Sequence, residues 1–274
     1  MNKKKPNSIN NDALKVVYFE PIPPVDKKLL RIFHEKNEGK DSLKIIPKDI
    51  ITIEIGYGLI ALCNKDLKGN IFEYIEYLRS DIVYEYGIKL PSIGIIDNPD
   101  LDIYEYCIKI RGEIFGQYII PQNEYIAIDP GDVKKKIKGK KIKEPVFGIS
   151  AFLISKDIVN IAVNAGYTVA DSGMIIKVHL DHIAKENLEK ILSYENSKKL
   201  LSDIKKKSPK LVEDVFNEFK FIEIKYVLQK ILSEKISLVN IEVILELILY
   251  YSLKTRDIEE IAINIISRFK YSTK

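Results

Sequence analysis

Several residue types that define common protein classes are scarce or missing in this sequence. It has no tryptophan, two cysteines and three histidines among its 274 residues. The cysteines, Cys63 and Cys107, are not spaced as a CxxC motif and have no histidine close to them in sequence. This argues against a zinc site or a disulfide framework and favours a reducing, cytoplasmic setting. We expect no metal and no cofactor.

Long hydrophobic runs are also missing. The richest one, "VILELILYY" at 243–251, has nine residues and contains Glu246, whereas a membrane-spanning helix needs about 20 apolar residues. The first residues, "MNKKKPNSINNDALKVV", are basic but have no apolar core, so they are not expected to act as a secretory signal. We expect a chain that does not cross a membrane by itself.

The familiar catalytic motifs are absent as well. There is no GxxxxGK[ST], GxGxxG, GxSxG or HExxH pattern. Four carboxylates could be imagined as acid–base pairs, but they lie in or beside predicted strands and turns, where such residues are common: Glu54, Asp97, Asp129 and Glu144. We expect no catalytic residues and no enzyme.

Two of the three histidines form the remaining candidate for chemistry. His179 and His182 lie three residues apart in "GYTVADSGMIIKVHLDHI", a spacing that metal sites on helices can use. Only Asp171 and Asp181 accompany them, and the surrounding apolar pattern predicts a packed helix. We interpret both histidines as structural. An enzyme that uses His179 with either aspartate is the less favoured alternative.

The charge balance is mildly basic. The chain has 43 Lys and Arg against 39 Asp and Glu, a net charge of +4. Much of the excess lies in short runs such as 134–143, without the interleaved aromatic residues typical of nucleic-acid readers. A nucleic-acid binder that uses 134–143 is therefore disfavoured.

The periodicity of apolar residues divides the chain into three parts. Residues 1–45, rich in Pro, Lys and Asn, are typical of an arm, with one short helix at 27–36. Strands and helices then mix, and beyond residue 192 only helical patterns follow. Strands are predicted at 49–56, 92–96, 103–112, 123–131, 146–154 and 167–171, with a loop or edge hairpin at 134–143. Helices are predicted at 70–87, 155–166, 172–192, 197–208, 208–219, 222–235, 240–254 and 256–269.

A series of phrases remains without a chemical explanation. In chain order they are "IEIGYGLIAL" (53–62), "IIDNPDL" (95–101), "YIAIDPG" (125–131), "EPVFGISAFLI" (144–154), "GYTVADSGMIIKVHL" (166–180), "SPKLVEDVF" (208–216) and "VLQKILSEKISLVNIEVILE" (227–246). Together they resemble one known family, the FHIPEP family, in the cytoplasmic domain of its type III export-gate proteins. The resemblance runs from about Ile45 to about Phe269.

The resemblance implies an α+β chain of several subdomains. A first subdomain with a mixed sheet would comprise 46–122 and 172–191, a small α/β subdomain would be inserted at 123–171, and an all-helical subdomain would follow at 192–274. The family's fourth subdomain would be missing, as would its transmembrane part. The chain would then be either an expressed fragment or a stand-alone paralogue.

The resemblance also implies a function in protein export without catalysis. Export-gate proteins of the flagellum and the injectisome form a nonameric ring through this domain, at the inner face of the cytoplasmic membrane. There they receive export chaperones with their substrates, contact other export apparatus proteins and help to switch between substrates. The alternative is a soluble, truncated paralogue with a regulatory or diverged protein-binding role.

The docking site implied by the resemblance is a shallow hydrophobic dimple between the first two subdomains. Family members place there an acidic residue and a Phe of "D-P-A-F-G", and a Thr before the His of "T-H-L". The matching positions are Glu144, Phe147 and Val178. An exposed Phe would supply apolar area for a partner helix, and a carboxylate at the rim would orient it. From the residues alone, Phe147 would instead be a core residue.

Overall fold

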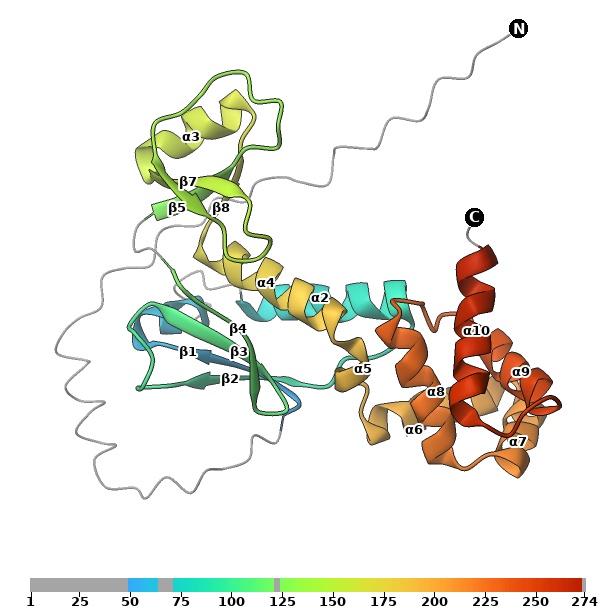
Figure 1. Ribbon diagram of the computed structural model, residues 1–274. Coiled ribbons are helices and arrows are strands. Elements are labelled where there is room, and N and C mark those ends of the chain that lie inside the picture. Colours follow the sequence, from blue (N-terminus) through green and yellow to red (C-terminus); the bar gives the residue numbers. More distant parts are fainter. Residues whose placement is uncertain (1–48, 64–70, 121–123, 273–274) are drawn as a thin grey trace, which may run out of the picture. The chain divides into compact units, whose positions relative to one another are not determined.

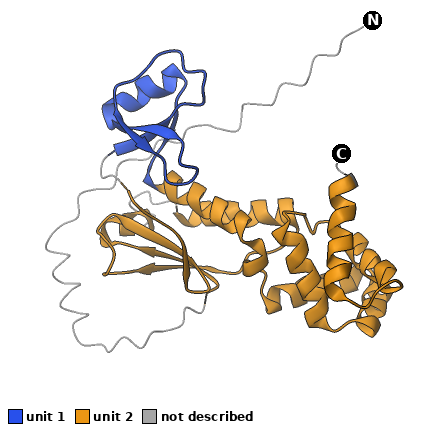
Figure 2. Cartoon of the chain, in the orientation of Figure 1, with its two compact units in different colours: residues 1–21, 122–172 blue, residues 22–121, 173–274 orange. Residues whose placement is uncertain are grey.

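The computed structural model describes residues 49–63, 71–120 and 124–272 (Figure 1). The predicted arm, 1–45, and its short helix at 27–36 lie outside the described residues. The chain divides into two compact units (Figure 2). Of the described residues, unit 1 contains 124–172, and unit 2 contains 49–63, 71–120 and 173–272. The predicted boundary between the first and the helical subdomain, at 191, lies inside unit 2.

Unit 2 contains a four-stranded mixed sheet. Its strands are β1 (Ile51–Ile55), β2 (Ile93–Asp97), β3 (Glu105–Ile110) and β4 (Glu113–Ile119), in the order β2-β1-β3-β4. β1 pairs parallel with β2 and antiparallel with β3, which pairs antiparallel with β4. On the inner strand β3, buried side chains point to both faces of the sheet, Tyr106 and Ile108 to one and Cys107 to the other. This confirms the predicted mixed sheet.

Two α-helices of this unit border the candidate site, and a short 3₁₀ helix precedes them. The 3₁₀ helix, η2 (Tyr57–Cys63), follows β1, and the first α-helix, α2 (Ile71–Tyr86), precedes β2. The predicted apolar stripe of α2 is buried as expected: Ile71, Ile75, Leu78, Ile82 and Tyr86. Gly87, at a φ of 72°, follows the last turn of α2, and its N–H bonds to Val83 O. The second helix, α4 (Ser172–Glu186), buries the neighbouring pair Ile175 and Ile176.

The rest of unit 2 is helical, as the sequence predicts. It consists of α5 (Leu188–Ile191), α6 (Tyr194–Lys207), α7 (Pro209–Glu218), α8 (Phe221–Ser233), α9 (Ile241–Ser252) and α10 (Ile258–Ser272). α8 supplies much of the core, since five of its apolar side chains are fully buried: Ile224, Val227, Leu228, Ile231 and Leu232. Among the described residues, no helix combines the length and the apolar character needed to cross a bilayer.

Unit 1 is a small α/β unit with its own core. Its strands β5 (Glu124–Ile128), β6 (Lys140–Lys143), β7 (Ser150–Ser155) and β8 (Thr168–Ala170) form an antiparallel sheet in the order β6-β7-β5-β8. α3 (Lys156–Ala165) packs on this sheet, and the core includes Tyr125, Ile154 and Tyr167. The basic stretch 134–143 ends in β6, an edge strand that pairs antiparallel with β7. This agrees with the predicted edge hairpin.

Three element predictions need correction. The predicted helix at 172–192 is interrupted at Asn187, whose side-chain amide bonds to Ile183 O at 2.9 Å. β4 was not predicted, because "EIFGQYI" alternates poorly and is largely exposed. β7 begins only at Ser150, because 145–147 form a turn. The α+β class itself is confirmed, with a mixed sheet followed by helices.

Candidate functional site

Phe147 is presented by a tight turn between β6 and β7 in unit 1. Its side chain is 60% exposed, so the interpretation of Phe147 as a core residue is wrong. The next residue, Gly148, has a φ of 67°, a conformation that favours glycine. Gly148 N donates to Glu144 O at 3.2 Å, and Glu144 N donates to Ile149 O at 3.0 Å. The backbone therefore closes the turn on both sides of the exposed ring.

Glu144 shapes this turn from inside. Its carboxylate accepts N–H groups from Val146 at 2.7 Å, Phe147 at 2.6 Å and Ile149 at 3.3 Å. Only 5% of Glu144 is exposed, so the expected carboxylate at an exposed rim is not what the structure has. Hydrogen bonds to a charged acceptor are stronger than neutral ones. Glu144 is thus a positioning residue that holds the backbone of Phe147 in place.

Val178 lies on α4 in unit 2, at a depression between α4 and α2. The depression has a volume of about 280 Å³ and is bordered by Tyr77, Leu78 and Asp81 of α2 and by Lys177, Val178 and Asp181 of α4. Val178 is half-buried there, and Tyr77 is 69% exposed. The position where the resemblance implies a Thr is therefore apolar here, and the depression that it borders also has an aromatic side chain.

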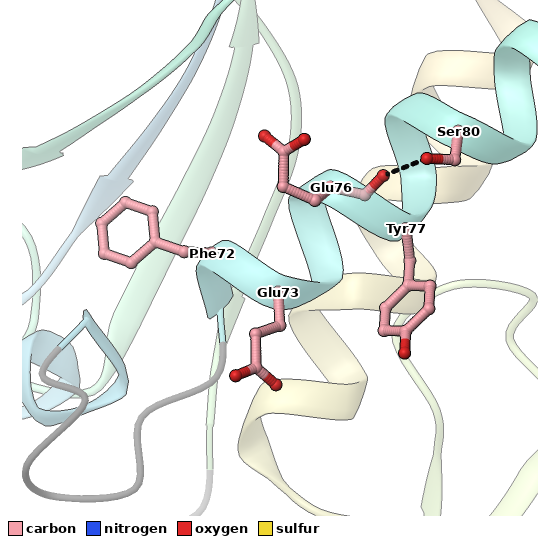
Figure 3. A pocket seen from close by; sticks show the side chains of 5 residues that line it. All are labelled: Phe72, Glu73, Glu76, Tyr77 and Ser80. Carbon is pink, nitrogen blue, oxygen red and sulfur yellow. Dashed lines mark hydrogen bonds between the residues drawn. The ribbon is translucent and has the colours of Figure 1, made fainter.

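A second depression adjoins the first along α2. It has a volume of about 370 Å³ and is bordered by Phe72, Glu73, Glu76, Tyr77 and Ser80 (Figure 3). All five come from α2, and the Ser80 hydroxyl donates to Glu76 O at 3.0 Å. Tyr77 belongs to both depressions. We call them together the α2–α4 surface, which combines exposed aromatic rings with carboxylates.

The α2–α4 surface is braced by an ion-pair cluster. The Lys185 ammonium of α4 lies 2.9 Å from Glu85, 3.2 Å from Asp81 and 3.5 Å from Asp181. Burial alone would lower the pKa of Lys185, but hydrogen bonds and charges from Glu85, Asp181 and Asp81 outweigh it and raise that pKa well above its usual range. The cluster ties α2 to α4 next to Val178.

The histidines do not form a metal site with other described residues. Among these residues, no group of three or more His, Cys, Asp or Glu side chains is arranged to hold a metal ion. His179 is buried, and its Nδ1 lies 2.8 Å from the Tyr106 hydroxyl of β3. The imidazole also lies against Gly116 of β4. His179 packs between α4 and the sheet, which agrees with a structural role.

The three predicted docking residues fall into both units. Glu144 and Phe147 share one turn of unit 1, and Val178 lies on the α2–α4 surface of unit 2. Sequence reasoning missed Tyr77 and Phe72. A signal for them was present, because both aromatic residues lie off the apolar stripe of α2 and the core cannot cover them.

Comparison with known proteins identifies the family of this chain. The model of the FHIPEP family matches residues 25–271, most of the chain. The chain belongs to the FHIPEP family. A relative, the flagellar biosynthesis protein FlhA of Treponema pallidum (strain Nichols), is 33% identical over 202 residues, which is 74% of this chain and 29% of that protein.

Solved structures share the fold of this FHIPEP chain. The CdsV protein of Chlamydia pneumoniae matches with a TM-score of 0.68 and 18% identity, over 82% of this chain and 65% of that one. The nonameric EscV cytosolic domain from the type III secretion system matches with a TM-score of 0.58 and 16% identity, over 80% and 63%. At these identities the likeness concerns the fold alone. The chain spans less than a third of the length of the FlhA relative.

Proposed function

We propose that this chain is a component of a type III protein export apparatus that docks export chaperones with their substrates. Membership of the FHIPEP family supports the export role, because the relatives it matches include flagellar biosynthesis proteins. The observation that carries the docking role is the Phe147 turn: an aromatic ring, 60% exposed, whose backbone is held by the buried carboxylate of Glu144.

An exposed aromatic side chain on a rigid turn is suited to binding rather than folding. Apolar area left in water has a free-energy cost, which a partner removes when it covers the ring. Because the Glu144 hydrogen bonds already fix the turn, little conformational entropy is lost when a partner binds. Phe147 therefore has the properties of a binding anchor.

The α2–α4 surface offers a second contact region. Tyr77, Phe72 and Val178 supply apolar area, and Glu73 and Glu76 supply carboxylates around it. An amphipathic helix with a basic flank has the matching chemistry. With Val in place of the family's Thr, Val178 cannot donate a hydrogen bond, so we expect a chaperone preference that differs from that of relatives with Thr.

Self-association into a ring is part of the same proposal. The EscV cytosolic domain, which shares the fold, is nonameric. A closed ring requires two different complementary surfaces on each copy, and each copy of this chain would supply both. In this role the chain contributes binding surfaces and no catalytic step.

Co-purification tests the docking proposal. The intact chain and its Phe147→Ala variant serve as baits for recombinant export chaperones of the same organism, each loaded with its substrate. The matched control is Ile161→Ala, which removes another exposed apolar side chain of unit 1. The proposal expects retention by the wild type and by Ile161→Ala, and loss with Phe147→Ala. If the wild type retains no export chaperone, the chain is a paralogue with a different role.

A further inference from the structure

A basic pocket lies in unit 2, on elements that the docking proposal does not use. It has a volume of about 660 Å³ and lies beside the turn between β3 and β4, α5 and α8. Its charged border consists of Arg111, Lys190, Lys225, Lys230 and Glu189. We call it the α5–α8 pocket.

Arg111 is held in position at one end of this pocket. It occupies the β3–β4 turn with a φ of 51°, and its backbone N–H bonds to Ile50 O at 2.7 Å. Its side-chain Nε donates to Lys190 O at 2.8 Å. Because Nε is engaged, the guanidinium is oriented, and within the described residues its two terminal nitrogens are available to a planar anion.

Lys225 lies nearby on α8, and its partner is neutral. Its ammonium donates to Gln229 Oε1 at 2.7 Å, and Gln229 Nε2 in turn donates to Glu189 O at 2.6 Å. Burial and then the positive charge of Arg111 lower the pKa of Lys225. The fold therefore keeps two like charges close together at a cost that an anion would relieve.

Carboxylates within the described part of the chain do not neutralise this end of the pocket. No described Asp or Glu lies within 4.0 Å of the charged nitrogens of Arg111, Lys190 or Lys225, whereas Lys230 pairs with Glu259 at 2.8 Å. The Oε2 atom of Glu189 is buried and has no hydrogen-bond partner in the described structure. This oxygen makes no ion pair with Arg111, Lys190 or Lys225 within 4.0 Å.

We propose that the α5–α8 pocket binds an acidic segment of a partner protein, with carboxylates at Arg111 and Lys225. We choose an acidic occupant because most charges at the border of the pocket are positive. The pocket follows α8 from Lys225 to Ser233, a rise of about 12 Å. Lys190 adds a third positive charge to its border, whereas Lys230 is already paired with Glu259. A border of this length suits successive side chains of a peptide better than one compact anion. The proposal stands whether or not Phe147 binds a chaperone.

Fluorescence anisotropy with a fluorescein-labelled hexaglutamate peptide tests this proposal on the intact chain. We expect saturable binding that weakens steeply as salt rises from about 50 to about 300 mM. Arg111→Glu and Lys225→Glu should each weaken binding about tenfold. The matched control is Lys210→Glu, an exposed lysine of α7 with the same change of net charge, which should bind as the wild type does.

Other outcomes would overturn the proposal. These are no binding by the wild type, an equal loss with Lys210→Glu, or displacement of the peptide by pyrophosphate at concentrations far below the peptide's own Kd, which would make the pocket a phosphate site. Circular dichroism checks that the variants fold. If a charge reversal unfolds the chain, Arg111→Gln and Lys225→Gln replace it, with about threefold weakening expected, about 0.65 kcal/mol at 25 °C.

Discussion

The Tyr106 hydroxyl lies 2.8 Å from Nδ1 of His179 and joins β3 to α4 inside unit 2. The two rings meet edge to face, with centroids 5.8 Å apart. The residues are 73 positions apart in sequence, so the contact fixes how α4 covers the sheet. His179 is therefore part of the packing that holds α4 on the sheet. Val178 precedes it on the same helix.

Tyr106→Phe should destabilise unit 2. The change keeps the ring but removes the hydroxyl from a buried imidazole, and a lost buried partner costs about 1–3 kcal/mol. Urea unfolding followed by circular dichroism measures the free energy of unfolding. Tyr84→Phe, at a side chain that is 86% exposed, is the control and should change little. Equal stability of both variants would show that the contact contributes nothing.

Gly116→Ala should also destabilise the packing of α4 on the sheet. A Cβ at this position would lie 2.5 Å from His179 Nε2 and 2.6 Å from Ile183 Cδ1. Both side chains are buried, so relief requires movement of α4, and overpacking of this kind costs about 1–3 kcal/mol. Thermal unfolding should show a lower Tm than for Gln117→Ala, an exposed site on the same strand. An unchanged Tm would contradict the close packing.

Lys185→Met should loosen the α2–α4 surface, because it leaves Asp81, Glu85 and Asp181 without their shared cation. We expect a loss of about 1 kcal/mol. The pKa of Lys185 is raised, so its contribution is fully present below the usual lysine pKa and is lost only as pH rises through the raised value.

Two measurements check the Lys185 prediction. The difference in unfolding free energy between Lys185→Met and the wild type should stay constant from about pH 6 to pH 9, since lysine titrates near 10.4 when unfolded. Lys206→Met, which removes a more exposed ion pair with Asp203, should have no measurable effect. If the difference in unfolding free energy disappeared as pH rises across this range, the prediction would be contradicted.

Cys107 should resist thiol reagents until the sheet unfolds. It is 2% exposed on β3, and burial raises the pKa of its thiol, so little reactive thiolate forms at neutral pH. In a Cys63→Ser variant, the disulfide reagent DTNB should label Cys107 only after urea is added. Rapid labelling of the native chain would show that β3 is not a protected inner strand.

Much of the fold could be predicted from periodicity. The apolar stripe of α2 and the strand β3 have patterns typical of their elements, and burial of those side chains determines the structure. β4 was missed because its alternation is weak, and its register shifts between Ile108 and Lys109 of the partner strand. The break at Asn187 depends on a side-chain amide that bonds to a backbone oxygen, which periodicity does not register.

The site was less predictable than the fold. The resemblance implied Glu144, Phe147 and Val178 as docking positions, but it did not indicate that the Glu144 carboxylate is buried. That burial follows from a turn whose N–H groups point inward. The meeting of Tyr77 with Val178 joins helices about 100 residues apart, and the α5–α8 pocket joins a hairpin to two later helices. Such meetings are set by tertiary packing, which a single sequence does not encode locally.

The most direct test is isothermal titration of one purified chaperone–substrate complex against the wild type, Phe147→Ala and Ile161→Ala, with the Tm of each. The docking role predicts binding at least about tenfold weaker for Phe147→Ala, a Tm within about 2 °C of the wild type, and normal behaviour of Ile161→Ala. Unchanged affinity of Phe147→Ala, or a large drop in its Tm, would contradict the role of Phe147 as an exposed anchor.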